Sequence, residues 1–265
     1  MKLNALLLRS KGVDGAAPMV LEVHGGPAGQ VKWEYHHFRQ FLVNRGYAVL
    51  AVNFRGSSGL GKIYQAAGYG EYGRKMQDDL VDATLWAIDQ GIADPNAIAI
   101  NGSSYGGYAS AMGLVRDPDL FKAGIIEHAM LDVAYQSQYP PHSWGLYLGQ
   151  WERYFGDINT PGDIDQMHQR SPINSVARMQ AAALMVAGKR DRVVGFEQTE
   201  RFISTAKELG KNIDSLIFEN EGHGIDKWQS RIRHARRVED FLAEHLGGRS
   251  GNWDWIEPIA AYLDN

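Results

Sequence analysis

Short apolar segments recur along the chain, and each is bounded by glycine, asparagine or aspartate. A strand inside a parallel sheet is buried on both faces, so continuous apolar runs of this length are typical of parallel strands. A first strand is also predicted within the opening residues 1–8. The buried strands are predicted at residues 19–23, 47–52, 97–100, 123–126, 182–187 and 215–218.

Segments with helical periodicity lie between these runs. Leu80, Ala83 and Ala87 fall on one face of a predicted helix. Further helices are predicted around residues 196–209 and from about 227 to 246. Alternation of strands with helices predicts an α/β domain with a mostly parallel central sheet and helices on both of its faces.

Residues 130–180 depart from this alternation. The stretch is rich in tyrosine and tryptophan, and two consecutive prolines break any long helix there. It is predicted to be a small aromatic-rich insertion, which either packs its own aromatic side chains or lines a pocket above the sheet. The pocket interpretation assigns Trp144 and Trp151 to its wall.

Residues 249–265 are predicted to form a separate C-terminal tail after a single domain predicted over 1–248. The tail contains Trp253, Trp255 and Ile256 and is too apolar for a free terminus. It either folds back over its own domain or packs against a second subunit in a homo-oligomer. The oligomer is favoured because an uncovered aromatic rim would expose an apolar patch.

The composition narrows the choice of partners and cofactors. The net charge of −4 offers no basic surface for nucleic acid or for an anionic membrane. The chain has no cysteine, which excludes disulfides and thiol chemistry and weakly favours a cytoplasmic location. No spacing typical of metal ligands is present, so neither a metal nor another cofactor is predicted. No apolar run approaches the ~18 residues of a membrane span, and the opening run is too short for a signal sequence.

One segment carries a specific catalytic signature. Residues 102–106 read Gly-Ser-Ser-Tyr-Gly and fit G-x-S-x-G between a predicted strand and a predicted helix. In such a nucleophile elbow, a sharp turn lifts the serine Oγ above the sheet. Ser104 is therefore the predicted nucleophile of a serine hydrolase, and the domain is predicted to have the α/β-hydrolase fold.

A serine nucleophile needs a histidine base and a carboxylate that orients the imidazole. In α/β-hydrolases these follow the serine in the order acid and then histidine. Asp191 comes just after the strand at 182–187, and His223 lies in a glycine-flanked loop after the strand at 215–218. These two residues are predicted to complete the triad.

Each partner has alternatives. Asp191 could serve only to cap the helix that follows it. Glu221 competes as the orienting acid, although its place two residues from His223 on the same loop makes the geometry awkward. Four other histidines lack a glycine-flanked loop after a strand and are predicted to be structural: His36, His37, His142 and His168.

The loop after the strand at 19–23 is a candidate for oxyanion stabilisation. It reads His24-Gly25-Gly26-Pro27 and matches the HGG-type loop of esterases and lipases. An oxyanion hole needs two preorganised N–H groups. The predicted donors are the amide of Tyr105, which follows the nucleophile, and that of Gly26, because Pro27 has no N–H.

Five segments in one order carry a family resemblance: 24–27, 53–61, 102–108, 188–194 and 221–224. They resemble the catalytic domain of the prolyl oligopeptidase family of serine peptidases, and within it acylaminoacyl-peptidase-like members. The resemblance implies Ser104 as nucleophile, Asp191 as orienting acid and His223 as base. In the segment 53–61, Arg55 is expected to pair with a carboxylate that braces the loop.

Two features depart from the family pattern. Family members usually carry an N-terminal β-propeller, for which 265 residues leave no room. Many members also place arginine or asparagine two residues after the catalytic aspartate, where it contacts the substrate backbone; here that residue is Val193. An apolar side chain cannot hydrogen-bond a peptide carbonyl, so a small acyl ester, an aryl ester or an acylated amino acid becomes a better candidate substrate. Val193 and Val194 are assigned to the substrate pocket.

Three functions remain open at this point. The leading one is a serine hydrolase that cleaves peptide or acylated amino-acid bonds through an acyl-enzyme. The first alternative is a carboxylesterase acting on small acyl esters. The second is a catalytically silent binding or assembly module, against which the intact order of serine, aspartate and histidine argues.

Overall fold

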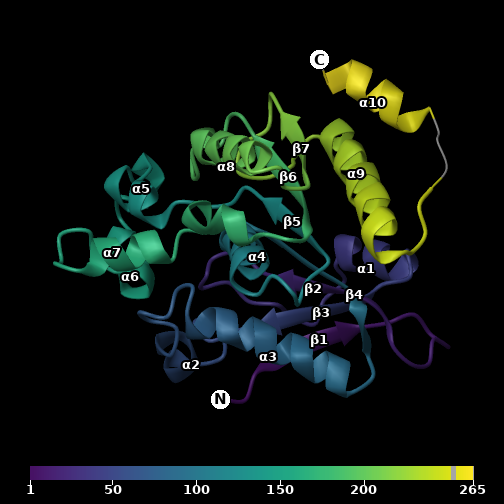
Figure 1. Ribbon diagram of the computed structural model, residues 1–265, viewed down its shortest axis with the longest axis horizontal. Coiled ribbons are helices and arrows are strands. Elements are labelled where there is room, and N and C mark those ends of the chain that lie inside the picture. The colour runs from purple at the N-terminus through teal and green to yellow at the C-terminus, as the bar shows by residue number, and fades with distance from the viewer. Residues whose placement is uncertain (252–254, 265) are drawn as a thin grey trace.

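The predicted strands assemble into one sheet in the computed structural model, which describes residues 1–251 and 255–264 (Figure 1). The order across the sheet is β1-β3-β2-β4-β5-β6-β7. Only β1 runs antiparallel to its neighbour, so the prediction of a mostly parallel sheet is confirmed. The strands are β1 Asn4–Leu8, β2 Ala17–Val23, β3 Ala48–Asn53, β4 Ala93–Ser103, β5 Ala123–Glu127, β6 Ala182–Gly188 and β7 Ile213–Phe218.

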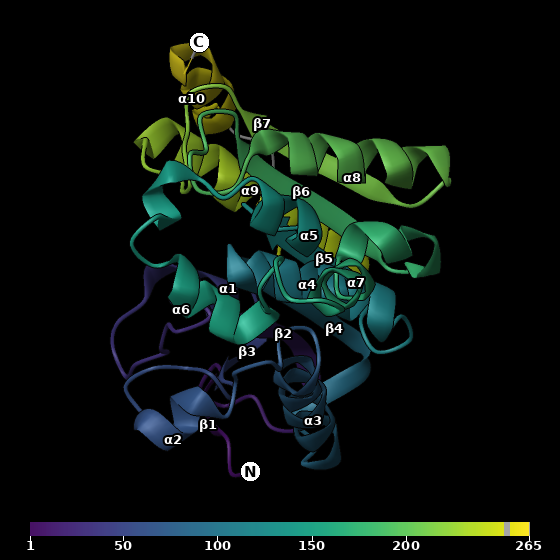
Figure 2. The ribbon, with the colours of Figure 1, turned by 90° about the vertical axis from the view of Figure 1, so that its left-hand side faces the viewer.

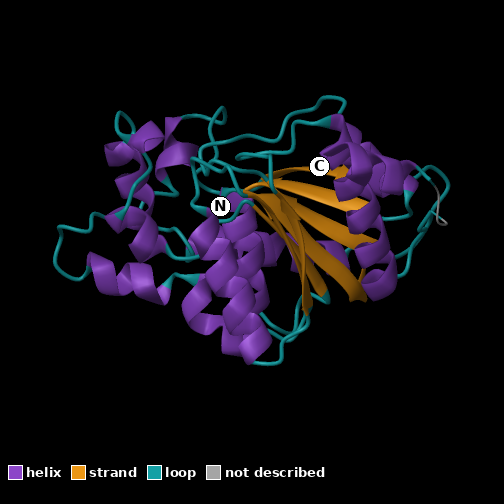
Figure 3. Ribbon diagram, turned by 90° about the horizontal axis from the view of Figure 1, so that it is seen from above, coloured by secondary structure: helices purple, strands orange, loops and turns teal. Residues whose placement is uncertain are grey.

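Helices cover both faces of this sheet (Figure 3). Side chains alternate along each strand, so Val20 packs in one core with α1 and α9, whereas Leu21 packs in the other with α3, α4 and α8. The alternation explains why the strands are apolar throughout. These helices span α1 His37–Asn44, α3 Lys75–Asp89, α4 Tyr105–Arg116, α8 Phe196–Glu208 and α9 Trp228–Leu246.

Strand β4 begins earlier than its apolar run predicts. The ladder pairs Ala17 with Ala93 and then jumps to Met19 with Ile98. Residues 94–97, Asp-Pro-Asn-Ala, bulge out of the ladder between these pairs. Polar residues and a proline mark a turn in the sequence, and the pairing of Ala93 and Ile98 with β2 on either side of the bulge keeps the whole segment within one strand.

The insertion consists of short helices. Its helices α5, α6 and α7 gather on one side of the molecule (Figures 1 and 2). The indoles of Trp144 and Trp151 stack at 5.0 Å between ring centroids, so the aromatic residues pack on one another. The elements are α5 Val133–Gln138, η1 His142–Trp144, α6 Leu148–Phe155, α7 Asp163–Gln169 and η2 Pro172–Arg178.

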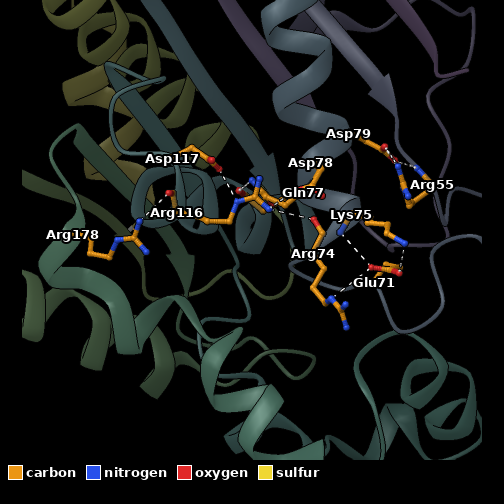
Figure 4. Close-up of polar contacts among 11 residues, drawn as sticks. Arg55, Glu71, Arg74, Lys75, Gln77, Asp78, Asp79, Arg116, Asp117 and Arg178 are labelled. Carbon is orange, nitrogen blue, oxygen red and sulfur yellow. Dashed lines mark hydrogen bonds and ion pairs between the residues drawn. The ribbon is translucent and has the colours of Figure 1, made fainter. Parts of the chain in front are cut away.

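Arg55 braces the loop after β3, as predicted (Figure 4). Its backbone amide and its Nε both donate to Oδ2 of the buried Asp79 on α3, each at 2.8 Å. A second arginine, Arg116 of α4, reaches Asp78 at 2.8 Å and Asp117 at 2.9 Å. These ion pairs connect both the loop after β3 and helix α4 to helix α3. The loop contains the short helix α2 (Lys62–Ala66).

The described part of the tail folds back along its own domain. The amide of Arg249 donates to the Arg45 carbonyl at 2.9 Å, and helix α10 (Ile256–Asp264) lies beside α9 with Ala260 buried (Figure 1). Trp253 lies outside the described residues. The large apolar residues in and next to α10 are each more than half exposed: Trp255, Ile256, Ile259, Tyr262 and Leu263. None of the helices described is both long enough and apolar enough to cross a bilayer.

Candidate active site

Ser104 occupies the sharp turn between β4 and α4. Its backbone has φ 61° and ψ −117°, which is uncommon for a residue with a side chain. Such a conformation persists only where the surroundings determine it. Here the Ser104 amide donates to the Glu127 carbonyl, and the Ser104 carbonyl accepts from the Tyr108 amide, both at 2.9 Å. The predicted elbow is therefore present at the predicted residue.

Three glycines around Ser104 allow α4 to lie directly on the sheet. A Cβ on Gly102 would come within 2.5 Å of the Val23 carbonyl oxygen of β2. A Cβ on Gly106 would overlap that same oxygen, and one on Gly107 would overlap the carbonyl oxygen of Glu127 in β5. The motif glycines thus set the distance between the helix and the two strands.

Asp191 and His223 meet although they follow different strands. Oδ2 of Asp191 lies 2.7 Å from Nδ1 of His223. The other carboxylate oxygen, Oδ1, accepts the amides of Val193 at 2.8 Å and Val194 at 2.9 Å. The Asp191 side chain is 2% exposed and that of His223 is 23% exposed. The carboxylate is thus held from one side by backbone amides and presents its other oxygen to the imidazole.

The surroundings of Asp191 favour its ionised form. Burial alone would raise the pKa of Asp191, but the imidazoles of His128 and His223 and the amide of Val194 outweigh it and hold the pKa below its ordinary range. An ionised carboxylate accepts the proton of Nδ1, which leaves Nε2 of the imidazole unprotonated. The pair can therefore present a proton acceptor to a neighbouring hydroxyl.

Glu221 has a different role from the one considered as an alternative to Asp191. Its buried carboxylate accepts the amides of Asp226 at 3.2 Å and Lys227 at 3.0 Å. Its carbonyl accepts the Arg190 amide at 2.9 Å, which joins the loop of His223 to the loop of Asp191. Glu221 therefore holds the loop in shape, and its carboxylate is engaged away from the imidazole.

The loop with the predicted oxyanion donors lies against the elbow. A Cβ on Gly25 would be 3.2 Å from the Ser103 carbonyl oxygen and 3.5 Å from Cβ of Ser104. Tyr105 is the first residue of α4, so its amide has no acceptor within the helix. The structure brings the segment of Gly26 beside Ser104, while the donor role of Gly26 and Tyr105 stays a prediction.

His24 anchors this loop to the loop after β3. Its Nε2 lies 2.8 Å from Oγ of Ser57, and its ring stacks on Phe54 with centroids 4.4 Å apart. Burial lowers the pKa of His24 to about 4, so the imidazole is neutral at physiological pH. A neutral ring suits this packed position at the start of the loop of Gly25 and Gly26.

The four predicted pocket residues all take part in packing. Trp144 is buried and lies against Trp151 and Phe155. Val193 and Val194 use their backbone amides to hold Asp191, and Val194 is buried. Contact of these side chains with a substrate stays a prediction.

A cavity of about 820 Å³ opens beside the elbow, on the face covered by α1 and α9. Ser103, Gly224 and His128 are among its lining residues, as are Glu127 and His234. Glu127 accepts from Asn101 at 3.0 Å and pairs with His234 at 3.2 Å. The carboxylate on this wall is therefore hydrogen-bonded within the fold.

The sequence prediction missed His128. It directly follows β5, and its Nδ1 lies 3.8 Å from Oδ2 of Asp191. Its ring centroid is 5.8 Å from that of His223. The available signal was a histidine at the end of a buried parallel strand, the same edge of the sheet that carries the other site residues.

Residues 33–249 match the model of the prolyl oligopeptidase family. The chain is 37% identical over 239 residues to dipeptidyl aminopeptidase BIII of Pseudoxanthomonas mexicana, a match covering 89% of this chain and 34% of that protein. It is 25% identical over 233 residues to acylamino-acid-releasing enzyme 1 of Oryza sativa subsp. japonica, covering 86% of this chain and 30% of the relative.

A solved puromycin-hydrolyzing peptidase of Mycobacterium tuberculosis has the same fold. It superposes with a TM-score of 0.86 and 28% identity over 95% of this chain and 38% of that one. The chain spans about a third of the length of the curated relatives it matches. This chain has the α/β-hydrolase architecture of its neighbours, and Ser104 occupies the turn before α4. By the extent of the family match, the chain belongs to the prolyl oligopeptidase family.

Proposed function

We propose that this chain is the catalytic domain of a serine peptidase that cleaves peptide or acylated amino-acid bonds. The observation that carries the proposal is the 2.7 Å contact between Asp191 and His223 together with the left-handed turn at Ser104. Relatives named dipeptidyl aminopeptidase and acylamino-acid-releasing enzyme support the same reaction class.

In the proposed reaction, Oγ of Ser104 attacks the carbonyl carbon and gives its proton to Nε2 of His223. Asp191 stabilises the imidazolium that forms. The amides of Gly26 and Tyr105 donate to the oxyanion of the tetrahedral intermediate. The imidazolium then protonates the leaving amine, and water attacks the acyl-enzyme by the reverse sequence of proton transfers.

A carboxylesterase is the second candidate, favoured by the position of Val193. Its amide is already bonded to Asp191, its carbonyl lies 3.4 Å from Nε2 of Gln136, and its side chain has no polar atom. Position 193 therefore offers no side-chain donor for a peptide carbonyl. Substrates that need no such contact include acyl esters and blocked amino acids.

A fluorophosphonate probe tests for an activated serine directly. We expect labelling of the wild-type chain and none of Ser104→Ala. Acylated amino-acid p-nitroanilides compared with p-nitrophenyl esters then separate a peptidase from an esterase by their kcat/KM values. A folded wild-type chain that resists the probe would support a catalytically silent module and contradict the proposal.

A further inference from the structure

His128 is a buried imidazole that the proposed reaction does not use. Its side chain is 1% exposed, and its position is set by a 2.9 Å hydrogen bond from its backbone amide to the Val186 carbonyl. Nδ1 is 3.8 Å from Oδ2 of Asp191, which is too far for a hydrogen bond. Neither ring nitrogen of His128 has a hydrogen-bond partner in the part of the chain that the structure describes. A buried polar atom without a partner is unfavourable, so this ring is ready to bind a ligand.

Three ligand atoms converge at this place. One ligand atom each of His128, Asp191 and His223 lies within 4.8 Å of the other two. Zn²⁺ in open sites takes three protein ligands of this kind, two histidines and a carboxylate, and leaves one position for water. Bond lengths of about 2.0–2.2 Å in tetrahedral geometry separate ligand atoms by about 3.4 Å. The two distances to Oδ2 of Asp191, 2.7 Å and 3.8 Å, bracket that value, and the separation between the two histidines lies within 4.8 Å, so side-chain rotations can bring the three ligands to a metal.

We propose that His128, Asp191 and His223 form a site for a divalent transition metal, with Zn²⁺ preferred, and that the metal inhibits the enzyme. Nitrogen ligands from two imidazoles suit Zn²⁺ better than Mg²⁺ or Ca²⁺, which take oxygen ligands. The three ligands follow three different strands, and for that reason no ligand spacing in the sequence indicates the site.

Inhibition follows from which atom the metal takes, and this step rests on the proposed function. The metal replaces the proton on Nδ1 of His223, which passes to solvent, and it breaks the hydrogen bond to Asp191. A dication on Nδ1 then opposes the positive charge that the ring gains when Nε2 accepts the serine proton. As long as the metal is bound to its three ligands, His223 cannot accept the serine proton.

The metal has a route to the site. His128 and Gly224 both line the 820 Å³ cavity on the α1 and α9 face, and the His223 side chain is partly exposed. A second pair of histidines, His36 and His37, lines the same cavity with their rings stacked 5.3 Å apart. A metal could also bind to that pair, so the test has to distinguish binding there from binding at the proposed site.

The test uses Ser104→Ala, which keeps the three ligands and cannot turn over substrate by the proposed route. Co²⁺ titration followed by d–d absorption, and Zn²⁺ titration followed by calorimetry, should show one bound ion per chain. Adding either His128→Asn or His223→Asn should abolish binding, whereas the exposed-surface change His168→Asn should leave it intact. Two ligand variants are used so that poor folding of one, checked by circular dichroism, leaves the other decisive.

Enzyme assays on the chain with Ser104 intact then test the consequence. Zn²⁺ should inhibit reversibly, with recovery on adding EDTA. For each variant, inhibition is measured relative to its own metal-free rate. The Zn²⁺ concentration that gives half inhibition should be at least about 100-fold higher in His128→Asn than in the wild type. A change of this size exceeds the loss of metal affinity that is typical when a residue only orients a ligand.

Binding that survives in both ligand variants, or that disappears when His36 and His37 are both changed to Asn, would overturn the inference. An active enzyme whose Ser104→Ala form binds no Co²⁺ also overturns it and leaves the proposed function standing. Conversely, the chain could bind one Co²⁺ or Zn²⁺ ion through His128 and yet not be labelled by the fluorophosphonate probe. That result would contradict the proposed function and support the metal site.

Discussion

Gly106 and Val23 touch so closely that a Cβ on the glycine would overlap the carbonyl oxygen of the valine. Gly106 lies in the first turn of α4 and Val23 ends β2, so this contact determines how near the helix that follows Ser104 comes to the sheet. The motif glycine is required by packing as well as by the turn.

Gly106→Ala is therefore expected to destabilise the fold. The helix has to move away from β2, and such overpacking typically lowers the free energy of unfolding by about 1–3 kcal/mol. Urea unfolding measures the difference. The matched control is Gly149→Ala in α6, where the nearest atom to an added Cβ is 3.8 Å away. Equal effects of the two changes would contradict the packing argument.

Ser104→Ala and His223→Ala should each lower kcat by at least about 10⁴-fold, and the double variant should be little worse, because the residues act as a unit. Asp191→Asn should also be severe, because the imidazole loses the carboxylate that selects its tautomer. Steady-state kinetics on one ester substrate measure all four variants. Ser204→Ala and His168→Ala, at exposed positions, are the controls. Near-normal turnover by Ser104→Ala would refute the assignment.

The lowered pKa of Asp191 predicts the shape of the pH profile. Its carboxylate stays ionised as the pH falls past the ordinary aspartate value of about 3.9, so its contribution is lost only in stronger acid. Above that range Asp191 does not titrate, so the acid limb of log kcat/KM should have a slope no steeper than one. Rates measured from about pH 4.5 to 9 test this expectation. A slope of two would mean that a second group titrates in the reaction.

His24 should make the fold sensitive to acid. Its pKa is about 4 in the folded chain and 6.5 ordinarily, so the unfolded chain takes up the proton first as the pH falls. Stability is therefore lost between these two values, by up to about 3 kcal/mol. Urea unfolding at pH 7 and pH 4.5 should show a smaller loss for His24→Asn than for the wild type. The same loss in both would rule out His24 as the cause.

The tail is expected to mediate self-association. Helix α10 leaves large apolar side chains exposed, including Trp255 and Tyr262, and burying each stabilises a complex by about 1.5–3 kcal/mol. Light scattering should show a larger species for the full chain than for a chain that ends at Gly248. If both are monomers, the exposed face of α10 has no role in assembly.

Local patterns in the sequence were sufficient to predict the strands of the sheet and most of the residues of the candidate site. The apolar runs predict six of the strands. The glycines within 102–107 can be recognised as a motif in the sequence because a larger residue at these positions would overlap the neighbouring strands. Asp191 and His223 could be found because each comes directly after a predicted strand. Carboxyl ends of parallel strands share one edge of a sheet, so residues far apart in the chain are bound to meet there.

The tertiary structure alone decided which groups at that edge touch. Asp79 as the partner of Arg55, the stacking of Trp144 on Trp151 and the approach of His128 to Asp191 depend on how neighbouring segments are placed in space. Periodicity reports which face of an element is buried, whereas distances between side chains on separate elements depend on strand register and loop path. For this reason the pattern of residues predicts the edge that holds the site, and the fold determines the contacts within it.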